Sequence, residues 1–311
     1  MLEADLNLKS SKNQLVAHFE ASNISLHIKR EDVIDPVISG NKFRKLKYNL
    51  QEASKTNFEI LLTFGGAFSN HIAATAAAGK RYRFKTIGII RGEELGENLE
   101  KTLMENVTLK YAASCGMQLE FVSRETYRSK MNDNFLEALR IKFGNFYLIP
   151  EGGTNKLAIK GCEEILQKKD KQFNFICCCV GTGGTISGII NSSTPEQKVL
   201  GFPALKGNWL ASEIKEYANK DNWELIQDYH FGGYAKTDSK LISFINSFRK
   251  KYQITLDPVY TGKMMYGIFD MIQNSAFPQN SRILAIHTGG LQGIAGMNTI
   301  LYKKNLPLLD V

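Results

Sequence analysis

The sequence has few cysteines, few prolines and no long apolar run. Its 311 residues include five cysteines and seven prolines. Three cysteines are adjacent, at 177–179, and no Cys-x-x-Cys pair occurs, so a disulfide framework is not expected. We interpret the cysteines as small apolar residues of a reduced, cytoplasmic protein. No apolar stretch approaches the roughly 18 residues of a membrane-spanning helix, and the N-terminus does not have the pattern of a signal peptide.

Charge of one sign is only in modest excess. Lys and Arg number 39 against 31 Asp and Glu, which gives a net charge of +8. The excess is scattered, and no run of five or more like charges occurs. A scattered excess is typical of a solubility effect, so neither nucleic acid nor a membrane is a predicted partner. The five histidines show no metal-ligand spacing, so no metal site is predicted.

A strand-like apolar segment, a Gly pair and a helical pattern follow one another four times. These units cover residues 59–79, 146–161, 175–190 and 283–296. Two further strands, at 86–90 and 119–123, lack the Gly pair, and the second precedes a helix from about Thr126. Continuous apolar strands alternating with helices predict a parallel sheet with helices on both faces. Because ligands bind at the carboxyl ends of such strands, the Gly-rich loops are expected to line a ligand site.

One of these loops, Gly181–Thr185, has the sequence Gly-Thr-Gly-Gly-Thr and precedes a predicted helix. Glycines let backbone N–H groups turn toward an anion, and a helix N-terminus adds further donors. The loop is not a dinucleotide fingerprint, because Ile186 stands where the third glycine would be, and it has no Walker A lysine. A phosphate cradle and an ordinary strand–helix turn both remain open at this point.

Lys42 begins a predicted helix, since Phe43, Leu46 and Leu50 recur at helical spacing. The amino end of a helix disfavours a cation and therefore lowers the pKa of a lysine there, as an amine nucleophile requires. The alternative is a solvated surface lysine in a lysine-rich segment. Ser69-Asn70-His71 likewise begins a helix expected over 72–79, where it would either cap the helix or bind a carboxylate or ring oxygen.

Taken together and in order, these segments resemble the D-cysteine desulfhydrase and 1-aminocyclopropane-1-carboxylate deaminase family. They are Lys-Arg-Glu-Asp at 29–32, Gly-Asn-Lys-x-Arg-Lys-Leu at 40–46, Gly-x-x-Ser-Asn-His at 66–71, Gly-Thr-Gly-Gly-Thr at 181–185, Asp-Pro-Val-Tyr-Thr-Gly-Lys at 257–263 and His-Thr-Gly-Gly at 287–290. The family consists of pyridoxal-phosphate enzymes, lyases and hydrolases, with the tryptophan-synthase-β fold. The resemblance implies an α/β, fold-type II structure with two open, twisted, mostly parallel sheets. It also implies a large domain of residues 1–49 and 153–311, a small domain of residues 50–152 inserted in it, and a homodimer.

The resemblance implies that Lys42 holds pyridoxal 5′-phosphate as a Schiff base and moves the substrate Cα proton. It places Asn70 at the ring 3′-oxygen, and Thr261 and Thr288 near the pyridine nitrogen. The implied phosphate cradle consists of Gly181, Thr182, Gly183, Gly184 and Thr185.

The resemblance also implies which residues meet a small amino-acid substrate. Ser69, Tyr260 and Tyr234 are the expected catalytic partners of Lys42. The expected substrate contacts are Ser69, Asn70, His71 and Tyr260. The Ser and His would lie by the substrate carboxylate and the reacting face, and the two tyrosines would face the substrate.

Two positions favour the desulfhydrase branch of the family. The ring-opening deaminases have Glu directly after the Tyr of the Tyr-x-Gly-Lys segment and tend to have Gln after Ser-Asn, whereas this chain has Thr261 and His71. Ala67-Phe68 replaces the Ile-Gln that is usual in both branches. We therefore expect α,β-elimination of D-cysteine, or of a related β-substituted amino acid, to pyruvate, ammonia and sulfide. The alternatives are 1-aminocyclopropane-1-carboxylate deamination to 2-oxobutanoate and ammonia, and a non-enzymatic phosphate- or nucleotide-binding protein.

Overall fold

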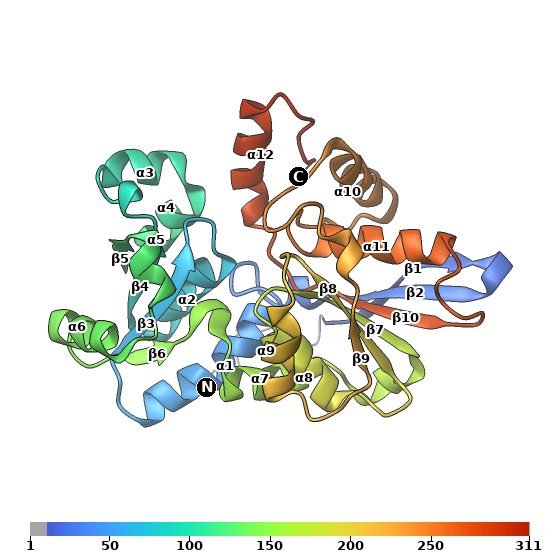
Figure 1. Cartoon of the computed structure of the whole chain (residues 1–311), viewed down its shortest axis with the longest axis horizontal. Coiled ribbons are helices and arrows are strands. Elements are labelled where there is room, and N and C mark those ends of the chain that lie inside the picture. The colour runs from blue at the N-terminus through green and yellow to red at the C-terminus, as the bar shows by residue number, and fades with distance from the viewer. Residues whose placement is uncertain (1–10, 311) are drawn as a thin grey trace.

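The computed structural model describes residues 11–310 and contains two sheets (Figure 1). The larger sheet has the strand order β1-β2-β10-β7-β8-β9. Its strands are β1 (Asn13–Phe19), β2 (Ile24–Lys29), β7 (Phe175–Val180), β8 (Lys198–Pro203), β9 (Trp223–Leu225) and β10 (Arg282–Ile286). Only β1 and β2 pair in antiparallel fashion, and the other neighbours are parallel.

The smaller sheet has four parallel strands in the order β5-β4-β3-β6. They are β3 (Ile60–Gly66), β4 (Lys85–Arg91), β5 (Met117–Val122) and β6 (Tyr147–Ile149). All six strands expected from the sequence are present, and together with the second sheet they confirm the predicted α/β class. β1, β2, β8 and β9 were not expected.

Helices cover both faces of each sheet. Around the smaller sheet lie α1 (Asn41–Lys55), α2 (Asn70–Tyr82), α3 (Leu99–Glu105), α4 (Val107–Ser114), α5 (Arg124–Arg128) and α6 (Asp133–Phe143). Against the larger sheet lie α7 (Lys156–Glu163), α8 (Gly184–Ser192), α9 (Trp209–Tyr217), α10 (Ser239–Tyr252), α11 (Thr261–Gln273) and α12 (Gly293–Lys303). In Figure 1 the two sheets lie side by side, with α1 and α9 between them. None of the helices within residues 11–310 is long and apolar enough to cross a bilayer.

The cysteines of β7 illustrate how a two-faced strand is buried. Cys177 and Cys179 belong to the core under α10 and α11, whereas Cys178 points into the opposite core under α8. All five cysteines are free thiols. Their use as small apolar residues, expected from the sequence, is confirmed.

Candidate active site

A cavity of about 450 Å³ lies between the carboxyl ends of strands from both sheets. The four Gly-Gly segments noted in the sequence each lie at or just after the end of a strand. Two belong to the smaller sheet, in the last two residues of β3 and after β6, and two belong to the larger one, after β7 and β10. All four contribute to the cavity wall. Eleven of the predicted site residues line it: Lys42, Ser69, Asn70, His71, Gly181, Thr182, Gly183, Thr185, Tyr234, Tyr260 and Thr288.

Two predicted residues, Gly184 and Thr261, lie behind the wall. Gly184 begins α8, and a Cβ atom there would lie 2.8 Å from Oγ1 of Thr154 and 3.1 Å from Nζ of Lys45. Thr261 begins α11 and is fully buried, and its hydroxyl donates to a carboxylate oxygen of Asp257 at 2.6 Å. Gly184 thus permits close packing beneath the loop, and Thr261 stabilises the turn that carries Tyr260.

Lys42 is the second residue of α1, as the sequence predicts, and its side chain lines the cavity. Gly40 precedes the helix with φ +58°, and the N–H of Asn41 donates to the carbonyl oxygen of Thr288 at 3.3 Å. Burial, together with the nearby Lys45 ammonium, lowers the pKa of Lys42 to about 7. A large fraction of this amine is therefore neutral and nucleophilic at physiological pH.

Lys45 lies one helical turn after Lys42 and is a functional candidate that the sequence analysis did not single out. It is only 2% exposed. Its Nζ donates to the carbonyl oxygen of Gly152 at 3.0 Å and to the hydroxyls of Thr154 at 3.0 Å and Thr182 at 3.3 Å. Burial lowers its pKa. The amino end of α8 and this cation face the same loop, Gly181–Thr185, so the loop offers an anion both N–H donors and positive charge. The Lys-x-x-Lys spacing on one helix was the signal for it.

Ser69, Asn70 and His71 combine capping with unused hydrogen-bonding capacity. The hydroxyl of Ser69 accepts the N–H of Ile72 at 3.3 Å, which confirms the expected helix cap. Oδ1 of Asn70 and Nδ1 of His71 are buried and have no partner among residues 11–310. A buried polar atom without a partner is costly, so a bound ligand that supplies one would be favoured.

The tautomer of His71 follows from its neighbours. Thr63 donates its single hydroxyl proton to the carbonyl oxygen of Ile149 at 2.8 Å, so its oxygen accepts from Nε2 of His71 at 2.9 Å. Burial and the charges of Lys42 and Lys45 lower the pKa of His71 well below its usual value. His71 is therefore neutral, and its bare Nδ1 is an acceptor.

Two buried residues position the predicted tyrosines. The carboxylate of Asp257 accepts the N–H groups of Val259 at 2.9 Å and Tyr260 at 2.8 Å. Nζ of Lys263 donates to the carbonyl oxygens of His230 at 2.9 Å and Gly233 at 2.8 Å, immediately before Tyr234. The rings of Tyr234 and Tyr260 meet edge to face at 6.3 Å, and burial raises the pKa of both hydroxyls. The Asp-Pro-Val-Tyr-Thr-Gly-Lys segment thus positions the rings of both Tyr234 and Tyr260 in the cavity wall.

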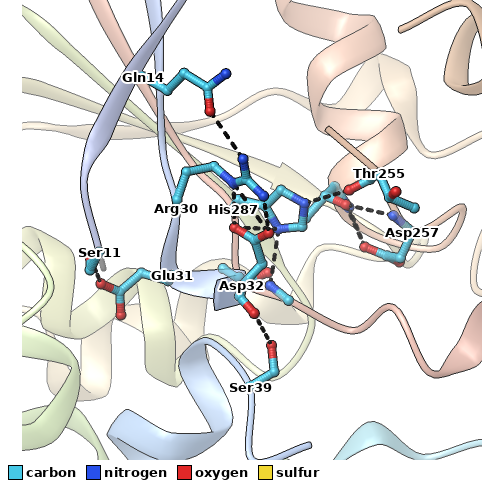
Figure 2. A network of polar contacts seen from close by, with 12 residues as sticks. Ser11, Gln14, Arg30, Glu31, Asp32, Ser39, Thr255, Asp257 and His287 are labelled. Atoms are coloured by element: carbon cyan, nitrogen blue, oxygen red, sulfur yellow. Dashed lines mark hydrogen bonds and ion pairs between the residues drawn. The ribbon is translucent and has the colours of Figure 1, made fainter. Parts of the chain in front are cut away.

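A polar network surrounds His287, the residue before Thr288, and Figure 2 shows its contacts with Asp32 and Thr255. The ring of His287 donates from Nε2 to the carbonyl oxygen of Thr255 at 2.7 Å and accepts the N–H of Gly289 at Nδ1, at 3.2 Å. Its Nδ1 lies 3.9 Å from a carboxylate oxygen of Asp32, and that carboxylate forms an ion pair with Arg30. The hydroxyl of Ser39 donates to the backbone oxygen of Asp32 at 3.1 Å. The network thus joins the loop after β10 to the segment that leads into α1.

These residues fit pyridoxal phosphate. The glycine-rich loop Gly181–Thr185, with the buried cation of Lys45 beside it, suits the phosphate of the cofactor. The half-buried amine of Lys42, with a pKa of about 7, suits the cofactor's aldehyde carbonyl. The unpartnered oxygen of Asn70 and nitrogen of His71 lie in the wall of the same cavity. When bound, this cofactor supplies an electron sink for bonds that break at the substrate Cα.

The comparisons with known proteins agree. The family described as pyridoxal-phosphate-dependent enzyme matches residues 12–289. The fold and the cavity therefore define a pyridoxal-phosphate-dependent enzyme, which confirms the predicted cofactor. A Thermotoga maritima protein, provisionally named a 1-aminocyclopropane-1-carboxylate deaminase, is 33% identical over 94% of this chain and 97% of its own. The Arabidopsis thaliana mitochondrial bifunctional D-cysteine desulfhydrase/1-aminocyclopropane-1-carboxylate deaminase is 30% identical over 86% of this chain and 73% of its own. The chain belongs to the 1-aminocyclopropane-1-carboxylate deaminase/D-cysteine desulfhydrase family.

Solved structures support the same conclusion for the fold. The crystal structure of a 1-aminocyclopropane-1-carboxylate deaminase homologue superposes with a TM-score of 0.76 at 28% identity, covering 91% of this chain and 90% of that one. A threonine deaminase from Solanum lycopersicum shares the fold, with a TM-score of 0.66 at 17% identity over 96% of this chain and 88% of its own. The predicted fold-type II architecture is confirmed.

Proposed function

We propose that this protein eliminates the thiol of D-cysteine, or of a related β-substituted amino acid, to give pyruvate, ammonia and sulfide. The observation that carries the proposal is the neutral amine of Lys42 in one cavity with Ser69 and Tyr260. In this proposal Lys42 takes the Cα proton. The hydroxyl of Ser69 and the N–H groups at the amino end of α2 bind the substrate carboxylate, and Tyr260 faces the departing thiol.

The wall at Thr288 supports elimination over ring opening. There the hydroxyl of Thr288 lies 3.1 Å from the thiol of Cys179. The nearby carboxylate of Asp257 already accepts three backbone N–H groups and the Thr261 hydroxyl. A hydroxyl leaves a pyridine nitrogen largely neutral, whereas a free carboxylate would hold it protonated. The weaker electron sink suffices for loss of a thiolate, while opening a cyclopropane ring is harder.

1-Aminocyclopropane-1-carboxylate deaminase activity is the second candidate, because relatives of 25–33% identity carry that name. This reaction would release 2-oxobutanoate and ammonia. The two candidates share Lys42 and the phosphate loop and differ in the carbonyl product, so product analysis separates them.

The test is the visible absorbance of the purified protein beside the Lys42→Ala variant, before and after addition of D-cysteine. The wild type should be yellow, lose that absorbance band on addition of D-cysteine, and release pyruvate and ammonia. Lys42→Ala should lack the yellow colour, whereas Lys55→Ala, an exposed position of the same helix, should retain it. Turnover of 1-aminocyclopropane-1-carboxylate but not of D-cysteine would reject the first proposal in favour of the second.

We also propose a cytoplasmic homodimer with residues 50–152 as its small domain. The four strands of the smaller sheet all fall within this range. The lower boundary falls inside α1, whose first turn lies at the cavity and whose apolar residues pack against the smaller sheet. Light scattering of the holoenzyme tests the dimer.

A further inference from the structure

A second and wider chamber opens outside the active-site cavity. It has a volume of about 1390 Å³, and its wall includes Phe68, Arg91, Glu151 and Trp209. The same four residues also line the inner cavity, so the two spaces adjoin there, and we call this shared wall the passage. The thiol of cysteine would fill only a small part of this volume, which raises the question of what the outer chamber accommodates.

The ion pairs of the chamber leave one side of it positive. Glu94 pairs with Arg124, and Glu151 pairs with Lys130 at 3.0 Å. These pairs account for two of the three carboxylates in the wall, and the third, Glu213, lies across the chamber on α9. The remaining cations are Arg91 and Arg128, on the side of the smaller sheet. Neither has an ion pair in residues 11–310.

Arg91 lies at the passage between the two spaces. It is the last residue of β4, and its Nη2 would be 3.6 Å from a Cβ atom on Gly66, the last residue of β3. The guanidinium stands over the ring of Tyr127, 5.7 Å from its centroid. Phe68 and Trp209, each more than two-fifths exposed, give the passage apolar walls. A guanidinium with free donors beside apolar walls suits an aliphatic chain that ends in a carboxylate.

We propose that the substrate carries a second carboxylate on its β-substituent, and that Arg91 binds this distal group in the outer chamber. This inference rests on the proposed elimination. In the reaction the Cα proton passes to Lys42, the Cβ–S bond breaks, and its electron pair leaves on sulfur as a thiolate. The remaining three-carbon enamine takes up one water and gives pyruvate and ammonium. Arg91 binds the carboxylate of the departing group and sets the specificity, while the amino end of α2 holds the α-carboxylate.

The experiment compares two substrates of equal size, S-carboxyethyl-cysteine and its amide S-carbamoylethyl-cysteine, in D and L forms, with D-cysteine as the reference. The cofactor-loaded wild type is measured beside Arg91→Gln and beside Arg140→Gln, an arginine of α6 that is 51% exposed and lies outside both cavities. Pyruvate release gives kcat/KM. We expect the wild type to favour the acid over the amide by about ten-fold or more, the worth of one charge-assisted hydrogen bond. Arg91→Gln should bring this ratio close to one by slowing only the acid, and Arg140→Gln should leave it unchanged.

Three outcomes would overturn the inference. An equal loss for acid and amide in Arg91→Gln would mean that Arg91 holds the α-carboxylate or only supports the fold. Turnover of D-cysteine without turnover of either larger substrate would mean that the chamber is not used, and the proposed elimination would stand. If no substrate reacts, the proposed function fails instead. In that case the dissociation constants of the acid and the amide are measured from the fluorescence of Trp209, one of two tryptophans, which lies in the chamber wall. Tighter binding of the acid than of the amide supports a carboxylate site at Arg91, and equal binding of the two rejects it.

Discussion

The carbonyl oxygen of Thr288 lies 2.1 Å from the position that a Cβ atom on Gly40 would occupy. Only glycine can stand there, because the oxygen belongs to the backbone and Gly40 also has φ +58° and ψ −132°. The contact joins the residue before α1 to the loop that follows β10. The entry of the chain into the Lys42 helix is therefore fixed by the loop that follows β10 of the larger sheet.

Replacing Gly40 by alanine should prevent correct placement of Lys42. Gly144→Ala is a matched control, because Gly144 has φ +78° and ψ −158° and nothing within 4 Å of its Cβ position. The control should lose about 1–3 kcal/mol of unfolding free energy from backbone strain. Gly40→Ala should lose more than about 4 kcal/mol, because backbone must move. Urea unfolding and the visible absorbance of the holoenzyme measure both effects, and equal losses in the two variants would contradict the clash.

The lowered pKa of Lys42 predicts a specific dependence of stability on pH. The pKa falls from 10.5 to about 7 on folding, so the unfolded chain binds more protons between these values. Unfolding free energy of the cofactor-free wild type should therefore rise with pH relative to Lys42→Met, by up to about 1.4 kcal/mol per pH unit. Urea titrations between pH 7 and pH 9.5 measure the slope. Parallel curves for the two proteins would show that Lys42 is not desolvated.

The lowered pKa of His71 predicts how the unfolding free energy changes at acidic pH. Its pKa is lowered on folding, so its contribution to stability is complete above about pH 6.5 and is lost as the pH falls below it. The His71→Gln variant keeps a donor for Thr63 and cannot be protonated, so it should lose less stability than the wild type between pH 7 and pH 5. His18→Gln, on the exposed face of β1, should behave as the wild type does. Unfolding of the cofactor-free proteins by urea checks this, and equal acid sensitivity of His71→Gln and wild type would refute it.

Lys45 should recognise the phosphate rather than the ring. We expect Lys45→Gln to weaken binding of pyridoxal phosphate by about ten-fold or more, the worth of a charge-assisted hydrogen bond, and to leave binding of unphosphorylated pyridoxal nearly unchanged. Absorbance titrations with both compounds give the ratio of affinities. The exposed Lys55→Gln serves as the control. A similar loss of affinity for both compounds would show that Lys45 does not act through the phosphate and acts, for instance, on the amine of Lys42.

The sequence predicts the inner part of this site because each strand end carries its own local signal. Gly181–Thr185 and Ser69–His71 combine a buried strand, small residues and a helix start, and all three features are visible in a short window. Helical spacing and the preceding glycine place Lys42 at a helix start, but its role as the nucleophile comes from the resemblance to the family, because a solvated surface lysine fits the same spacing. The local features depend on neighbours along the chain, so no knowledge of the fold is needed to see them.

The rest of the site depends on neighbours in space. Thr261 follows Tyr260 in the sequence, but Asp257 holds its hydroxyl in the interior, and only the turn geometry shows this. That Arg91 has no ion pair within residues 11–310 becomes apparent only when the ion pairs of the other cations are known. The edge strands β1 and β9 have weak apolar patterns because one side of each is solvated. Their place in the larger sheet is set by pairing with β2 and β8.

Helix α1 belongs to both halves of the molecule. Its first turn meets Thr288 after β10, while Phe43, Leu46 and Leu50 are built into the core that contains Leu61 of β3. The same helix is held just as closely by the larger half. A Cβ atom on Gly161 of α7 would lie 1.9 Å from the carbonyl oxygen of Arg44, and Lys47 pairs with Glu164 at 2.8 Å. The backbone that carries Lys42 is therefore held from two sides, so a packing defect in either core would displace the amine as well.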